Sequence, residues 1–307
     1  VSAAYPGTPS TEISENIVQY DEIYAEWSPN EKVATEVAIG ASISGVRAMA
    51  SMKHVGVNVA SDPLYTISYG GVGGGLVLVA ADDPGIYSSQ NEQDTRCVAR
   101  AAMVPVLEPS DSQEAKDFVK CAYEISEKYD TPVIVRTTTR LAHSQGTVTL
   151  EDRVEVADKP YKRNPGKFVM MPVNAIKRHV YVEKRMKALV EDGCSFAINR
   201  AEYNDTSIGF ITSGIPYQYV KEACPDASVL KLGMVHPLPR KLIEEFASRV
   251  DKLYIFEELE PVIEEQVKSW GIQAEGKELF TVQGEYSANL LRERVLKQEV
   301  CLKQPAD

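Results

Sequence analysis

The sequence is poor in cysteine, and its cysteines lie far apart along the chain. Five cysteines are spread over 307 residues, and no Cys-x-x-Cys pair occurs among them. A disulfide framework would need an even, closely spaced set, and a zinc or iron–sulfur site would need clustered ligands. The sequence therefore predicts free thiols in a reducing cytoplasm.

Long apolar runs and an excess of positive charge are also missing. The longest apolar run, residues 76–81, is far too short to span a bilayer. The formal net charge of −11 argues against a nucleic-acid partner, because phosphate binding needs a basic surface. With 44% hydrophobic and 25% charged residues, the chain has the composition of a globular protein and the length for two domains.

Several common catalytic motifs are absent from the sequence. It contains no P-loop, no H-E-x-x-H and no G-x-S-x-G, and none of its four histidines are spaced as metal ligands. The glycine cluster at residues 70–75 precedes a strand-like segment, whereas a dinucleotide-binding loop follows a strand and opens a helix. We interpret this cluster as a flexible turn.

Strand-like and helix-like segments alternate through residues 1–150. The pattern predicts strands at 1–5, 76–81, 104–107 and 132–136, a strand or turn at 54–60, and helices at 10–24, 30–52, 62–69 and 112–129. The run at 76–81 is apolar without alternation, as in a strand buried on both faces. The fold class we expect is α/β, with a parallel sheet that carries helices on both faces.

The pattern weakens after residue 141 and resumes near residue 205. We expect a connecting segment at 151–204, with a basic helix at 173–192, and a second, smaller α/β domain at 205–307. In that domain the sequence predicts strands at 206–212, 228–232 and 252–257, and helices at 216–223, 240–249 and 262–270.

One helix combines an acidic start with many small residues. Glu31 lies in its first turn, and Gly40 follows within a run of alanine, serine and glycine. A glutamate at this place is typical of charge complementing the helix dipole. A carboxylate in a partly desolvated pocket can also share a proton with a heterocyclic nitrogen, and small residues let a flat ring or a second backbone approach.

Several segments resemble one family. They are YPGTPS from residue 5, NEKVATEVAIGASISGVRA from residue 30, MKHVGVNVASDP from residue 52, ADDPG from residue 81, SSQNEQD from residue 88 and LEPSDSQEAK from residue 107. They are similar to alpha subunits of the indolepyruvate type within the thiamine-diphosphate-dependent 2-oxoacid:ferredoxin oxidoreductases. The resemblance implies a pyrimidine-binding domain at 1–150. It also implies that residues 205–307 are similar to the carboxyl-terminal domain of transketolase.

The resemblance implies roles for individual residues. Glu31 would contact the aminopyrimidine of the cofactor and promote its activation, with Gly40 in the same cofactor-binding segment. Thr8 would approach the substrate carboxylate, although its hydroxyl could equally cap the following helix. Lys53 and His54 would bind that carboxylate or donate a proton, and a structural role for both is an open alternative.

A second group of candidates follows a parallel strand. Ligands of open α/β sheets bind at the carboxyl ends of strands, so we expect cofactor contacts from Asp82, Asp83, Gln90 and Asn91. Pyruvate oxidoreductases place a substrate-binding arginine after the matching strand, and this chain has ADDPG there. That departure favours aryl pyruvates over a small substrate.

The activity implied is oxidative decarboxylation of indolepyruvate and other aryl pyruvates to aryl-acetyl-CoA, with coenzyme A as acceptor and ferredoxin as oxidant. Open alternatives are a branched-chain or 2-oxoglutarate enzyme, and a non-catalytic assembly subunit. The sequence lacks the G-D-G motif of the diphosphate-binding domain and the cysteine-rich ferredoxin-like segment. We therefore expect Mg²⁺ and [4Fe–4S] clusters on a missing domain or another subunit, a chain inactive by itself, and a homodimer or higher assembly.

Overall fold

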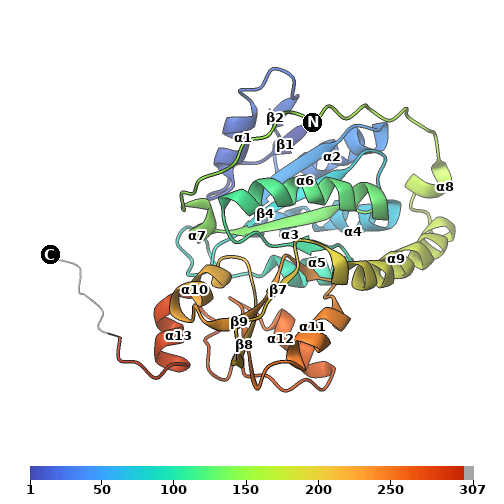
Figure 1. The fold of residues 1–307 in the computed structure, drawn as a ribbon. Helices are drawn as coiled ribbons and strands as arrows, with labels where there is room; N and C mark the ends of the chain where they lie inside the picture. Colours follow the sequence, from blue (N-terminus) through green and yellow to red (C-terminus); the bar gives the residue numbers. More distant parts are fainter. Residues whose placement is uncertain (301–307) are drawn as a thin grey trace.

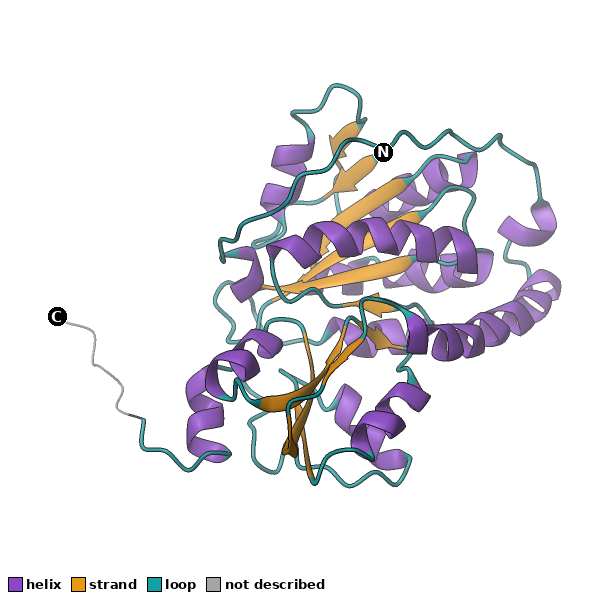
Figure 2. Cartoon of the chain, in the orientation of Figure 1, coloured by secondary structure: helices purple, strands orange, loops and turns teal. Residues whose placement is uncertain are grey.

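Two β-sheets organise the protein, one of seven strands and one of four (Figure 1, Figure 2). The structure, a computed structural model, describes residues 1–300. The larger sheet is built mainly from the first half of the chain, and the smaller sheet lies beside it, built from the second half.

The strands of both sheets are mostly parallel. The larger sheet has the order β10 (Met234–His236), β5 (Val106–Leu107), β6 (Val133–Thr138), β4 (Leu76–Asp82), β3 (Ala48–Lys53), β1 (Ser2–Ala4) and β2 (Ala25–Trp27). The smaller sheet has the order β11 (Lys252–Phe256), β8 (Asp205–Ser213), β9 (Ala227–Leu232) and β7 (Arg200–Glu202). Only the edge strands β10 and β7 pair antiparallel.

Helices cover both faces of the larger sheet. On one face α2 (Glu31–Ser44), α3 (His54–Val59), α4 (Ser61–Gly70) and α5 (Thr95–Ala102) pack on alternate strand residues such as Leu78 and Ile134. On the other face α1 (Thr11–Ile17) and α6 (Ser112–Tyr129) pack on Val77 and Val135. In Figure 1 α6 crosses in front of the sheet, with α2 and α4 behind it. The predicted α/β fold with two covered faces is confirmed.

The remaining helices connect the sheets or cover the smaller one. They are α7 (Thr139–Ala142), α8 (Pro165–Phe168), α9 (Pro172–Asp192), α10 (Pro216–Ala223), α11 (Arg240–Ala247), α12 (Val262–Ser269) and α13 (Ala288–Arg294), with a 3₁₀ turn, η1, at Gly193–Ser195. No helix within residues 1–300 is both long enough and apolar enough to cross a membrane.

The predicted helix at 30–52 is wrong in its second half. α2 ends at Ser44, and residues 48–53 form the buried strand β3. Gly45 ends the helix with φ 105°, and a side chain there would meet the carbonyl oxygen of Lys159 at 1.9 Å. The predicted strand or turn at 54–60 is also wrong, because His54–Val59 forms α3.

The two sheets exchange strands across the expected domain boundaries. β7, from the connecting segment, joins the smaller sheet, and β10, from the second half, joins the larger one. One hydrophobic core includes Leu78 of the larger sheet and Ile211 of the smaller sheet. The division into 1–150, 151–204 and 205–307 stays a prediction.

Candidate functional site

The sheet order changes direction between β1 and β3. From β1 the chain adds β2 on one side and then β3 on the other, so the carboxyl ends of β1 and β3 flank a topological switch point, where open α/β sheets bind ligands. Thr8 follows β1, and Lys53 is the last residue of β3. A side chain at Gly7 would lie 3.3 Å from Cβ of Lys53, so the two loops touch.

Lys53 is buried and bound to the loop after β4. Its Nζ donates to the carbonyl oxygen of Ser88 (2.6 Å) and to Ser88 Oγ (3.2 Å), and it lies 3.8 Å from Asp83 Oδ2. Ser88 Oγ also donates to the carbonyl oxygen of Thr8 (3.5 Å). Three of the predicted residues, Thr8, Lys53 and Asp83, therefore meet around Ser88.

Thr8 itself is exposed, with its side chain free of a capping role. The residue that precedes α1 is Ser10, and its hydroxyl donates to the carbonyl oxygen of Gly7 (2.7 Å) rather than accepting from the helix. The structure gives no support to the interpretation of Thr8 as a helix cap.

Asp83 organises the loop from within. Its carboxylate accepts hydrogen bonds from the backbone of Ser88 (2.9 Å), from Ser89 Oγ (2.5 Å) and from Thr139 Oγ1 (2.7 Å). Burial by itself would raise the pKa of Asp83, but these hydrogen bonds and Lys53 hold it below its usual value. Asp83 thus acts on the site by fixing the loop that holds Lys53.

Asp82 belongs to a buried network of charges. It accepts from Arg136 Nε (2.6 Å) and from the backbone of Thr95 (3.0 Å), and its side chain is fully buried. Burial raises the pKa of Asp82, with Arg136 opposing the shift. Asp82 and Asp83 accept hydrogen bonds from other groups of this chain. The cofactor contacts expected of these two residues stay a prediction.

His54 begins α3 directly behind Lys53. It is 1% exposed, and neither ring nitrogen has a hydrogen-bond partner within the described part of the chain. Burial lowers the pKa of His54, so its neutral form is favoured. A buried imidazole without hydrogen-bond partners is energetically costly, and both nitrogens of His54 are closed off from the surface.

Glu31 is the first residue of α2 and is half-buried. Asn30 caps the helix by accepting from the backbone of Val33 (3.0 Å), so the Glu31 carboxylate is not needed as a cap. Its side chain packs against Gly56 of α3, where a Cβ would lie 2.6 Å from Glu31 Cγ and 2.7 Å from Oε1. No hydrogen bond or ion pair to this carboxylate exists among residues 1–300.

Three predicted residues lie apart from this cluster. Gly40 is exposed, about 13 Å along the helix from Glu31, and a side chain there would meet nothing within 4 Å. Gln90 and Asn91 are exposed on the loop after β4, and Asn91 accepts from Gln93 Nε2 (2.8 Å). Their cofactor contacts stay a prediction.

The loop after β4 is also held by the second half of the chain. Glu92 Oε1 accepts from the backbone of Gly85 (2.6 Å) and of Gly284 (2.8 Å). Glu285 pairs with Arg140 and accepts from Tyr87 Oη (3.1 Å). The residues near 284 thus support the loop that binds Lys53.

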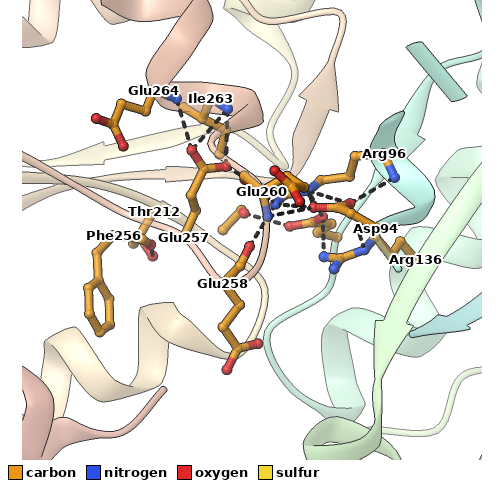
Figure 3. A network of polar contacts seen from close by, with 12 residues as sticks. Asp94, Arg96, Arg136, Thr212, Phe256, Glu257, Glu258, Glu260, Ile263 and Glu264 are labelled. Atoms are coloured by element: carbon orange, nitrogen blue, oxygen red, sulfur yellow. Dashed lines mark hydrogen bonds and ion pairs between the residues drawn. The ribbon is translucent and has the colours of Figure 1, made fainter. Parts of the chain in front are cut away.

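A buried ionic cluster joins the two sheets beneath the loop (Figure 3). Arg96 of α5, 1% exposed, pairs with Asp94 (2.6 Å) and with Glu257 at the end of β11 (2.7 Å). Arg96 also donates to the carbonyl oxygens of Glu258 (2.7 Å) and Glu260 (3.0 Å). Burial would raise the pKa of Asp94, but Arg96 holds it at about 2.

Asp82 is the one predicted site residue that belongs to this network, and only a weak signal in the sequence indicates the other members. Arg136 lies within β6 after three apolar residues, and a buried arginine in such a strand requires an acidic partner. One such partner is Glu108, whose carboxylate accepts hydrogen bonds from Arg136 Nη1 (2.7 Å) and from Ser213 Oγ (2.5 Å). The sequence does not indicate that the second sheet supplies Ser213 and Glu257.

The described part of the chain contains no cluster of side chains suited to a metal ion. Across residues 1–300, no group of three or more histidine, cysteine, aspartate or glutamate side chains is placed to hold a metal ion. Cys97, Cys121, Cys194 and Cys224 are free thiols, and Cys301 lies outside the described residues.

Comparison with known families defines the class of protein. Residues 1–207 match the model of the pyruvate flavodoxin/ferredoxin oxidoreductase, thiamine diphosphate-binding family. The chain belongs to this family, and the resemblance predicted from the sequence is confirmed. Thr8, Glu31 and Lys53 therefore all lie within the part of the chain that matches a thiamine diphosphate-binding family.

Within the family, similar relatives are indolepyruvate oxidoreductase subunits IorA. The subunit from Pyrococcus horikoshii is 45% identical over 300 residues, which cover 91% of this chain and 46% of that protein. The subunit from Pyrococcus abyssi is 47% identical over 302 residues, with the same shares covered. The chain thus spans about half the length of these relatives.

Solved structures share the fold at low identity. A 2-oxoglutarate:ferredoxin oxidoreductase from Magnetococcus marinus superposes with a TM-score of 0.76 at 16% identity, over 96% of this chain and 61% of that one. An inactive tetramer of a split-gene transketolase superposes with a TM-score of 0.60 at 18% identity, over 96% of this chain and 86% of that one. Both sheets of this chain therefore have counterparts in the folds of these two solved structures.

Proposed function

We propose that this chain supplies the aminopyrimidine half of a thiamine diphosphate site, with Glu31 as its acidic residue. The observation that carries the proposal is the Glu31 carboxylate, which is half-buried, placed at a helix start and without a partner among the described side chains. A carboxylate held ready in this way can share a proton with a ring nitrogen of the cofactor.

The surrounding residues fit a flat aromatic ring. Gly56 leaves the Glu31 side chain the space that a Cβ would take, and His54 lies buried at the start of the same short helix. Thiamine diphosphate, when bound, supplies the nucleophilic carbon that attacks a 2-oxoacid. Glu31 would hold the proton that tunes the aminopyrimidine, and Gly40, Asp82, Asp83, Gln90 and Asn91 would complete its surroundings.

The substrate carboxylate would be bound at the switch point. Lys53 carries a positive charge in a buried position, and the Thr8 hydroxyl lies on the adjoining loop. Lys53 would attract the carboxylate, Thr8 would donate a hydrogen bond to it, and His54 would hold or donate a proton. Asp83 and Ser88 fix the position of Lys53 and so set where the substrate binds.

The reaction would be oxidative decarboxylation of indolepyruvate and related aryl pyruvates. Support comes from the IorA relatives at 45% and 47% identity, whereas 2-oxoglutarate synthase subunits KorA match at 26% over only 181 residues. In this proposal coenzyme A accepts the acyl group and ferredoxin accepts the electrons through [4Fe–4S] clusters. Those clusters, Mg²⁺ and the diphosphate ligands would lie outside residues 1–300, in a dimeric or larger cytoplasmic assembly.

The test replaces Glu31 in the assembled enzyme. Glu31→Gln keeps the size of the side chain and removes its charge, and we expect turnover of indolepyruvate to fall by about 100-fold or more. Glu36→Gln is the matched control, because Glu36 is exposed on the same helix. Gel filtration and thermal unfolding should show both variants assembled and folded.

Unchanged turnover in Glu31→Gln would refute the catalytic assignment and favour a non-catalytic assembly subunit. The substrate class is tested separately with a panel of 2-oxoacids. If indolepyruvate had no advantage in kcat/KM over pyruvate and 2-oxoglutarate, the aryl pyruvate assignment would be wrong and the cofactor assignment would stand.

A further inference from the structure

A basic concavity lies at the edge of the larger sheet opposite the Glu31 site. It has a volume of about 290 Å³ between the end of α6 and the middle of α9. Asp130, which lies in it, comes just before β6, so the concavity opens at the amino ends of the strands. Its wall includes four cationic side chains, those of Lys128, Arg178, Lys184 and Arg185.

The carboxylates near this concavity are already bound. Asp130 pairs with Arg178 (2.8 Å) and Lys167 (2.7 Å) and accepts from the backbone of Val72 (2.8 Å). Lys128 pairs with Asp192 (3.1 Å). These pairs leave Lys184 and Arg185, in the described part of the chain, with no carboxylate within 4.0 Å.

Of the two cations, Arg185 is the buried one, so its charge carries the larger desolvation cost. It is 7% exposed, its two terminal nitrogens reach only the carbonyl oxygens of Asp130 (3.1 Å) and Met103 (3.3 Å), and its Nε has no partner within residues 1–300. Burial lowers the pKa of Arg185 to about 10, and the negative charge of nearby Asp130 offsets that lowering only in part. A buried charge in this state is stabilised by any anion that reaches it.

An aromatic ring lies beside these cations. Tyr181 is 60% exposed, and the Arg178 guanidinium lies 5.0 Å from the centre of its ring. Guanidinium and ammonium groups are the preferred partners of phosphate, and an exposed tyrosine ring can cover a flat organic group next to it.

We propose that this concavity binds a phosphate-bearing small molecule, with Arg185 and Lys184 contacting the phosphate and Tyr181 the organic part. This site lies at the other edge of the sheet from Thr8, Glu31 and Lys53. Its occupancy would stabilise the packing of α9 on α6, because the anion would neutralise the cation buried between them.

The experiment measures thermal unfolding of the chain with inorganic phosphate and with phenyl phosphate, against sodium chloride at equal ionic strength. We expect both phosphates to raise the unfolding temperature in a saturable way and phenyl phosphate to bind more tightly. Lys184→Met should weaken the apparent affinity about tenfold or more, and Arg185→Met should abolish the effect. Tyr181→Ala should remove the preference for phenyl phosphate and leave inorganic phosphate binding intact.

Lys187→Met is the control, because Lys187 is exposed on the same helix outside the concavity. Lys184→Met changes an exposed residue, so it still tests the proposal if Arg185→Met fails to fold. A phosphate effect no larger than that of chloride, or one equally weakened by Lys187→Met, would overturn the proposal. Inorganic phosphate binding without a preference for phenyl phosphate would overturn the role of Tyr181 and indicate a free phosphate ion as the ligand.

Discussion

The ionic cluster around Arg96 gives the sharpest prediction for stability. Arg96→Met keeps an unbranched apolar stem but removes the cation that binds Asp94 and Glu257, both of which are buried. The two carboxylates would lose their main counter-charge, and two backbone carbonyls would lose their donor. We expect the variant to fold with a much lower free energy of unfolding.

The magnitude follows from two routes. Breaking a buried ion pair by removing one partner costs about 3–5 kcal/mol. The Asp94 pKa, lowered to about 2 from its ordinary 3.8, corresponds to about 2 kcal/mol for that carboxylate, to which Arg96 contributes more than Arg136. We therefore expect a loss of about 4 kcal/mol, a large part of the 5–15 kcal/mol typical of a whole domain.

Urea unfolding followed by tryptophan fluorescence measures this loss. Trp27 lies on β2 of the larger sheet and Trp270 follows α12 beside the smaller sheet, so single Trp→Phe variants report on each sheet separately. Because Arg96 joins the sheets, its loss should also separate the two midpoints. Arg249→Met, which breaks an exposed pair with Glu245, should change stability by less than about 1 kcal/mol. A loss below about 1 kcal/mol for Arg96→Met would refute the reasoning.

Two further predictions concern Gly56 and Glu258. Gly56→Ala would place a Cβ 2.6 Å from Glu31 Cγ and so turn the Glu31 side chain away. We expect turnover of the assembled enzyme to fall about 100-fold, with no decrease in the unfolding midpoint. Unchanged turnover would contradict the placement of Glu31. Burial raises the pKa of Glu258 to about 7, so the folded state keeps a proton that the unfolded state loses near pH 4.5. Stability from this group is therefore present below pH 4.5 and lost as pH rises to about 7, by up to about 3 kcal/mol. Glu258→Gln should stabilise the protein at pH 8 and not at pH 4.5, measured by urea midpoints, and an equal effect at both pH values would count against this pKa.

Periodic segments of the sequence were predicted well. The helix at 112–129, opened by Asp111, is confirmed with the same bounds, because an amphipathic face and a capping aspartate that accepts from Glu114 act locally. The buried strand at 76–81 is confirmed as β4, since an uninterrupted apolar run fits a strand covered on both faces.

Features set by distant contacts were not predictable in this way. The small residues of 30–52 gave no sign that the helix ends at Gly45, where the backbone of Lys159 passes too close for a side chain. Residues 48–53 form β3 because parallel pairing with β1 and β4 outweighs their local preference. The carboxyl-edge candidates Thr8, Lys53 and Asp83 could be foreseen from the family pattern, whereas Gly56 as the neighbour of Glu31 could not.

The short strand β10 has a consequence for where the polypeptide can be divided. It returns from the second half of the chain to pair with β5, and it covers the edge that Val106 and Leu107 would otherwise present. A fragment ending before β10 would carry an unpaired apolar edge, which is a template for aggregation. We therefore expect any division of this polypeptide to keep β10 with the sheet that it completes.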